Sequence, residues 1–140
     1  MNILLLGDIV GPSGSKAVIE KLPDIIKKKK LDFVIVNGEN AADQGVGITK
    51  NNVEQFLNAG ADVITTGNHV WDQKEAIEYI NVEKRLLRPQ NLVAGSPGSG
   101  FGIFRSKSNK KVAVINLMGN IFMKKCEDVF IEAKKFMEKI

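Results

Sequence analysis

The chain has 140 residues, of which 44% are hydrophobic and 26% are charged. These fractions match soluble globular domains and argue against a disordered chain, a collagen-like repeat and a coiled-coil rod. A single cysteine, Cys126, cannot form an intramolecular disulfide. The opening residues lack a signal-peptide pattern and no apolar run reaches roughly 18 residues, so we expect a cytoplasmic protein with no membrane partner.

The charge balance is positive, with 20 Lys and Arg against 16 Asp and Glu and a net charge of +4. Such a balance permits an anionic ligand or a nucleic acid. Four of the lysines, however, form the run 27–30 at the end of an expected helix, where cations are favourable beside the negative end of the helix dipole. Aromatic residues make up only 6% of the chain and do not alternate with basic ones on a strand, so we expect no DNA partner.

Strands and helices are predicted to alternate from the first residues onwards. An apolar strand at 2–6 is followed by a helix at about 15–30, interrupted at Pro23. A second strand at 33–36 precedes a helix that Thr49 would cap. This repetition is typical of β-α units.

The same unit occurs a third time. A strand at 63–66 precedes a helix that Asp72 and Glu75 would cap, since they have capping-box spacing. The inward face of this helix would carry three apolar residues, Ala76, Ile77 and Ile80.

The pattern changes after residue 92. Strand-like segments at 101–104 and 112–117 are separated by turn-rich sequence, and a last helix is predicted at about 128–140. No low-complexity linker divides the chain, so we expect one domain over residues 1–140. Its fold class is α/β, with a largely parallel sheet that is flanked by helices, covered on both faces and connected by right-handed crossovers.

Ligands of such sheets bind at the carboxyl ends of the strands. Each predicted strand of the repeat, and the segment at 112–117, is followed by glycine and by polar side chains, of which at least one carries oxygen. These residues are Asp8, Glu39 with Asn40, Asn68 with His69, and Asn120.

Two carboxylates and several amides without a neighbouring Lys or Arg form an oxygen-rich, negative cluster, which a divalent cation relieves. We therefore expect a metal site in which Asp8 and Glu39 bind as anions, Glu39 bridges two ions, and Asn40 and Asn68 give neutral oxygens. Such ligands suit Mn²⁺, Fe or Mg²⁺. The alternative is that these residues only form turns, as Asp and Asn often do after strands.

His69 is the one histidine of the sequence and directly follows an expected ligand. It is well placed to donate a proton to a leaving oxygen, although a partly exposed loop histidine is the alternative. We expect Trp71 to be a packing anchor beneath the loop rather than a base-stacking platform, and Asp72 to be a helix cap rather than a ligand.

Three segments carry a resemblance to a known family: GDIVG at the start, VNGENAADQGVGIT after the second strand, and GADVITTGNHVWD around the third. They resemble the YmdB-like family of calcineurin-type metallophosphoesterases, and the later VAVINLMGNIFM fits it too. The resemblance implies that Asp8, Glu39, Asn40 and Asn68 bind two divalent metal ions and that His69 is the catalytic proton donor. It also implies hydrolysis of a small phosphodiester, a 2′,3′- or 3′,5′-cyclic nucleotide.

Members of that family are longer, and their C-terminal part supplies further histidine ligands, whereas this sequence has no histidine after His69. The resemblance therefore implies that the chain is the N-terminal part of the metallophosphoesterase domain. An open sheet edge there would favour a homo-oligomer.

Two other functions stay open. The glycine-rich segment GDIVGPSG lies between a strand and a helix and could hold a phosphate in a nucleotide-binding module without hydrolysis. It lacks the spacing of known phosphate loops, and Asp8 would repel a phosphate unless a cation intervened. An inactive fragment that binds a protein or RNA partner is the third interpretation.

Overall fold

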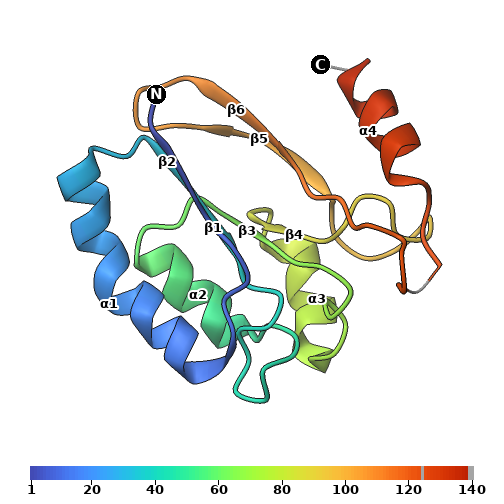
Figure 1. Cartoon of the computed structure of the whole chain (residues 1–140), viewed down its shortest axis with the longest axis horizontal. Coiled ribbons are helices and arrows are strands. Elements are labelled where there is room, and N and C mark those ends of the chain that lie inside the picture. Colours follow the sequence, from blue (N-terminus) through green and yellow to red (C-terminus); the bar gives the residue numbers. More distant parts are fainter. Residues whose placement is uncertain (124, 139–140) are drawn as a thin grey trace.

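The computed structural model describes residues 1–123 and 125–138. Figure 1 shows a parallel sheet with its connecting helices, followed by a hairpin and a last helix. The sheet has the order β1-β2-β3-β4, with β1 at Ile3–Leu6, β2 at Phe33–Asn37, β3 at Val63–Thr65 and β4 at Leu86–Leu87. The helices that connect its strands are α1 (Gly11–Lys29), α2 (Lys50–Asn58) and α3 (Lys74–Val82). The chain continues into β5 (Phe101–Arg105), β6 (Lys111–Ile115) and α4 (Val129–Met137). The predicted α/β class with a largely parallel sheet is confirmed.

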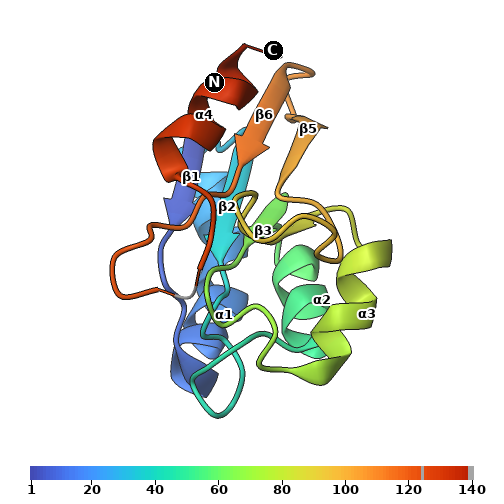
Figure 2. The ribbon, with the colours of Figure 1, turned by 90° about the vertical axis from the view of Figure 1, so that its right-hand side faces the viewer.

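The three connecting helices lie on one face of the sheet (Figure 1). The strands follow one another in sequence order, and right-handed crossovers that always step in the same direction leave every helix on the same side. Figure 2 shows the β5–β6 hairpin and α4 on the side away from α2 and α3. The second face is therefore covered by an antiparallel hairpin, where the sequence analysis expected a layer like the first.

The main core lies between the sheet and these helices. Its strand residues include Val34, Val36, Ile64 and Leu86, and its helix residues include Val18, Leu22, Val53, Phe56 and Ile80. Truncating a fully buried phenylalanine such as Phe56 to alanine costs about 3–5 kcal/mol. This layer fixes the positions of the loops at the strand ends.

A smaller core joins the sheet to the hairpin. Phe33, Val63 and Leu87 pack there against Val112 and Val114. β1 takes no part in it, although the register places Ile3 opposite Phe33 on the same face. Ile3 and Leu5 are exposed, so the cover of the second face stops at β2.

Helix α1 continues through Pro23, so the predicted interruption is wrong. Pro12 lies in its first turn, where a proline costs nothing in hydrogen bonds. Leu22 is buried before Pro23, and Ile26 packs against the same core after it. Packing on both sides keeps the helix together despite the hydrogen bond that Pro23 cannot donate.

Helix α3 is not capped by Asp72, which corrects a second prediction. The helix begins after Gln73, whose side chain makes no capping bond. Glu75 instead accepts a hydrogen bond of 2.9 Å from the backbone N–H of Lys50, at the start of α2. Of the three residues expected inside, Ala76 and Ile80 are buried and Ile77 is exposed.

The fourth strand of the parallel sheet is the two-residue β4, which the sequence analysis missed. The predicted strand at 112–117 corresponds to β6 and pairs antiparallel with β5. The last helix begins after Asp128, which accepts hydrogen bonds from the N–H groups of Phe130 and Ile131. Its predicted end at residue 140 lies outside the described residues. No helix among the residues described is long and apolar enough to cross a bilayer.

Candidate functional site

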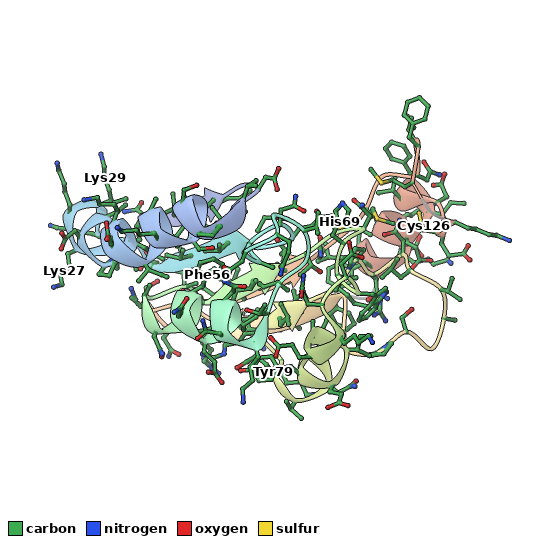
Figure 3. The ribbon with its side chains drawn as sticks, turned by 90° about the horizontal axis from the view of Figure 1, so that it is seen from below. Lys27, Lys29, Phe56, His69, Tyr79 and Cys126 are labelled. Atoms are coloured by element: carbon green, nitrogen blue, oxygen red, sulfur yellow. The ribbon has the colours of Figure 1, made fainter. Side chains whose placement is uncertain are left out.

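The loops after β1, β2 and β3 surround one pocket of about 520 Å³. All four expected metal ligands and the expected proton donor line it: Asp8, Glu39, Asn40, Asn68 and His69. Asn120 does not, because it is exposed and follows β6, which belongs to the hairpin. In Figure 3, His69 lies far from Lys27 and Lys29, which end α1 at the amino ends of the strands. The lysine run therefore contributes nothing to this pocket.

Asp8 and Asn40 are joined directly. The Asn40 side chain donates a hydrogen bond of 2.8 Å from Nδ2 to Oδ1 of Asp8. The two loops also pair through their backbones, since the Ile9 N–H donates to the Asn37 carbonyl and the Gly11 N–H to the Asn40 carbonyl. These bonds hold Asp8 at a φ of 36°, a left-handed conformation that is uncommon outside glycine.

The side-chain oxygen of Asn40, Oδ1, is buried and accepts no hydrogen bond from the described residues. A buried acceptor without a partner costs about 1–3 kcal/mol. A cation at this point would supply the missing partner, and it would also neutralise the Asp8 carboxylate next to it. This oxygen is the feature of the pocket that best fits a bound metal ion.

Glu39 is held from two sides. Its own backbone N–H donates to Oδ1 of Asn37 at 3.2 Å, and the backbone N–H of His69 donates to its Oε1 at 3.2 Å. Its carboxylate also lies against Gly67, where any β-carbon would collide with it. Glycine at position 67 is thus required for the Glu39 carboxylate to lie between the second and third loops.

His69 is held by Asp72 in the same loop. Its Nδ1 lies 2.6 Å from Oδ2 of Asp72, so a proton on Nδ1 is donated to that carboxylate. This contact leaves Nε2 for exchange with a ligand. Asp72 is therefore a partner that fixes the orientation of the imidazole.

The four expected ligands suit a hard divalent cation in type, since they are two carboxylates and two amides, and none of the described residues that line the pocket is Lys or Arg. They are few in number. In the described part of the chain, no group of three or more His, Cys, Asp or Glu side chains could hold an ion. An ion bound here would therefore use the amide oxygens as ligands, and donors beyond the described residues would complete its coordination.

Three residues around the site were missed by the sequence analysis. Asn37 and Thr65 end neighbouring strands, are register partners and both line the pocket. Their polar side chains at the last strand position were the signal that could have identified them. Asp72 was interpreted as a cap, although its spacing of three residues from His69 also suits a contact within one loop.

A family model described as YmdB-like protein matches residues 4–140. The chain belongs to this family. A curated relative of this YmdB-like chain is the 2′,3′-cyclic-nucleotide 2′-phosphodiesterase of Bacillus subtilis (strain 168), 41% identical over 137 residues. That match covers 98% of this chain and 51% of the relative.

Two solved structures resemble the YmdB-like chain over nearly its whole length. A hypothetical protein from Thermus thermophilus matches with a TM-score of 0.91 and 35% identity, covering 100% of this chain and 54% of that one. A novel phosphatase from Mycoplasma pneumoniae matches with a TM-score of 0.86 and 31% identity, and the match covers 96% of this chain and 50% of that one. The chain thus spans about half the length of the relatives it matches.

Proposed function

We propose that this chain forms the N-terminal part of a metal-dependent phosphodiesterase centre, residues 1–140 being the corresponding part of a metallophosphoesterase domain. The observation that carries the proposal is the buried Oδ1 of Asn40, which has no hydrogen-bond partner among the described residues and lies beside the Asp8 carboxylate. Glu39, Asn68 and His69 line the same pocket. The substrate class is a small phosphodiester, a 2′,3′- or 3′,5′-cyclic nucleotide. The name of the Bacillus subtilis relative supports the 2′,3′ isomer.

In this proposal the carboxylates of Asp8 and Glu39 and the amide oxygens of Asn40 and Asn68 would hold two divalent ions, of Mn, Fe or Mg. The chemistry that bound ions supply is neutralisation of charge on the phosphoryl oxygens and activation of water as the nucleophile. Asp72 fixes the His69 ring through Nδ1. When the ring carries a proton on both nitrogens, Nε2 donates its proton to the ribose oxygen as the bond of that oxygen to phosphorus breaks, and the neutral ring that remains keeps its proton on Nδ1.

A second candidate function is binding of a nucleotide or phosphate without hydrolysis. Its support is the small number of anionic ligands that the described residues bring together. Asp8 opposes a metal-free version, because its carboxylate lies in the pocket and would repel a phosphate. A second copy of the chain could complete the centre in a homo-oligomer, and the cytoplasmic setting stays a prediction.

Metal binding is tested first, by thermal unfolding with MnCl₂, with MgCl₂ and with EDTA. An ion present at 100 times its dissociation constant stabilises the fold by about 2.7 kcal/mol. We expect Mn²⁺ to raise the Tm of the wild-type chain by several degrees and to leave Asp8→Asn and Glu39→Gln unchanged. Asp43→Asn is the matched control, since Asp43 is exposed and does not line the pocket.

Hydrolysis is tested next, with bis-p-nitrophenyl phosphate and with both cyclic AMP isomers. Turnover that EDTA abolishes and Mn²⁺ restores supports the phosphodiesterase. Metal-induced stabilisation without turnover, even at high protein concentration, supports the binding module instead. No Mn²⁺-dependent change in either measurement would overturn the metal centre.

A further inference from the structure

A second, smaller pocket adjoins the polar one. It has a volume of about 170 Å³ and five apolar residues in its lining, Val70, Trp71, Leu92, Val93 and Met118. Asn68 lines both pockets. A pocket below the roughly 300–1,000 Å³ of sites for drug-sized molecules accommodates a single ring system.

The walls of this apolar pocket are fixed by the fold. Trp71 and Leu92 pack against the main core. Met118 is held through Asn91, which is fully buried, donates from Nδ2 to the Met118 carbonyl at 2.7 Å and accepts from the Met118 N–H at 3.0 Å. The pocket is therefore preformed, and a ligand does not have to order it.

The two pockets share Asn68 in their linings, and residues close together in the sequence line both of them. His69 lines the polar pocket and Trp71, two residues later in the same loop, lines the apolar one. A ligand with a phosphoryl group near His69 and an aromatic ring against Trp71 would occupy both. The sequence analysis favoured a packing anchor over a base-stacking platform for Trp71, and the packing of Trp71 against the main core agrees with the anchor role.

We propose that the apolar pocket binds the nucleobase of the phosphodiester, with Trp71 as the aromatic surface against which the base lies. This assignment rests on the proposed function, because it places the phosphoryl group in the polar pocket. A base offers a flat π-face to the indole and to the aliphatic side chains of Leu92 and Val93. Ser96 lies at the same pocket and donates its hydroxyl proton to the Val93 carbonyl, which leaves its oxygen to accept from an amino group of the base.

Trp71 is the one tryptophan of the sequence, so its fluorescence reports on this pocket. The probe is adenosine, which has a base and no phosphate, added to the full chain in EDTA. We expect saturable quenching by adenosine and none by ribose 5-phosphate, which lacks the base. Val93→Glu, at an exposed edge of the pocket, should weaken adenosine binding by about tenfold or more.

Val82→Glu, an equally exposed residue at the end of α3, is the matched control and should bind adenosine as the wild type does. Circular dichroism of both variants checks the fold. Absence of saturable quenching, or equal binding by Val93→Glu and the wild type, overturns the proposal. The Mn²⁺ melting experiment is independent, so adenosine binding without Mn²⁺ stabilisation keeps the base site and refutes the metal centre alone.

Discussion

Asp8 illustrates how much the pocket depends on single residues. Its φ of 36° is one that L-residues adopt at a cost, and Asp and Asn are the non-glycine residues that tolerate it best. Strain of this kind persists only where neighbouring contacts hold it, as the bonds of Ile9 and Gly11 to the second loop do here. The carboxylate is thereby fixed against Asn40.

Asp72 should fix the tautomer of the neutral His69 ring. Because His69 is the one histidine of the sequence, its ring nitrogens give a single, assignable set of NMR signals. In the wild type we expect the proton of the neutral ring to be on Nδ1, and we expect a mixture of tautomers in Asp72→Asn, whose amide can also donate. A positioned proton donor contributes about 10²–10⁴ in rate, so Mn²⁺-dependent turnover should fall by at least about tenfold.

The control is Mn²⁺-dependent stabilisation, which Asp72→Asn should retain because Asp72 does not line the polar pocket. Identical ring spectra for Asp72→Asn and the wild type would show that the contact does not fix the imidazole.

At the scale of the elements, helix α2 depends on a reciprocal cap. Thr49 Oγ1 accepts from the Asn52 N–H at 3.1 Å, and Asn52 Oδ1 accepts from the Thr49 N–H at 3.1 Å. We expect Thr49→Ala to lower the free energy of unfolding by about 1 kcal/mol. Urea unfolding measures it, with Thr49→Ser as the conservative control that keeps the cap, and equal midpoints for Thr49→Ala and wild type would contradict a stabilising cap.

Asp62 joins β2 to the start of β3 and should make stability depend on pH. Burial raises the pKa of the Asp62 carboxyl above its ordinary value of 3.8, against the lowering effect of the hydrogen bond from the Val34 N–H. The folded chain therefore binds this proton more tightly than the unfolded chain does. Stability from this group is present below the ordinary pKa and is lost as pH rises through the folded one.

Asp62→Asn keeps an acceptor for Val34 and removes the charge. Urea midpoints from about pH 4 to about pH 7 should fall less with pH in Asp62→Asn than in the wild type. Asp24→Asn, on an exposed part of α1, is the matched control for the substitution. If the difference in urea midpoint between the wild type and Asp62→Asn does not change with pH, the Asp62 carboxyl does not make stability depend on pH.

The elements that the sequence predicted best are those with strong local signals. The three aliphatic strands and the cap at Thr49 were found within a residue or two, because hydrophobic runs and capping residues act locally. The strand at 86–87 was missed because two residues carry no periodicity, and Pro23 misled because packing on both sides of it outweighs the lost bond. Asp72 was misassigned because an acidic residue before a helix suits both a cap and a contact with His69.

The site was predictable for a different reason. The carboxyl ends of parallel strands converge whatever the details of the loops, so Asp8, Glu39 and Asn68 had to meet. The prediction that Asn120 joins these residues was wrong for the same reason, because β6 does not belong to the parallel sheet. Contacts such as that between the Glu39 carboxylate and Gly67 depend on distances in space, and the spacing of residues along the sequence does not give these distances.

At the scale of the whole molecule, apolar surface is distributed unevenly. Ile3 is 47% exposed and Leu5 is 66% exposed on the face of β1 that the hairpin leaves open. β1 is an edge strand, and its residues Ile3–Leu6 include no charge and no proline, the usual protections of an edge. Such a strand favours pairing with a second chain.

We therefore expect the wild-type chain to associate reversibly as its concentration rises, through β1. Ile3→Lys places a charge on the open face without touching the main core, and it should shift the chain towards the monomer. Light scattering coupled to size-exclusion chromatography over a dilution series measures the change. Leu5 is unsuitable for this test because it also lines the polar pocket.

Val82→Lys is the matched control, because Val82 is 70% exposed but belongs to α3 on the helix-covered side of the sheet. If the surface of β1 drives association, Val82→Lys should associate like the wild type while Ile3→Lys does not. If both variants reduce association equally, net charge is the cause, since each variant adds one positive charge to a chain with a net charge of +4. A wild-type chain that stays monomeric throughout would mean that the edge strand is protected by its short length of four residues alone.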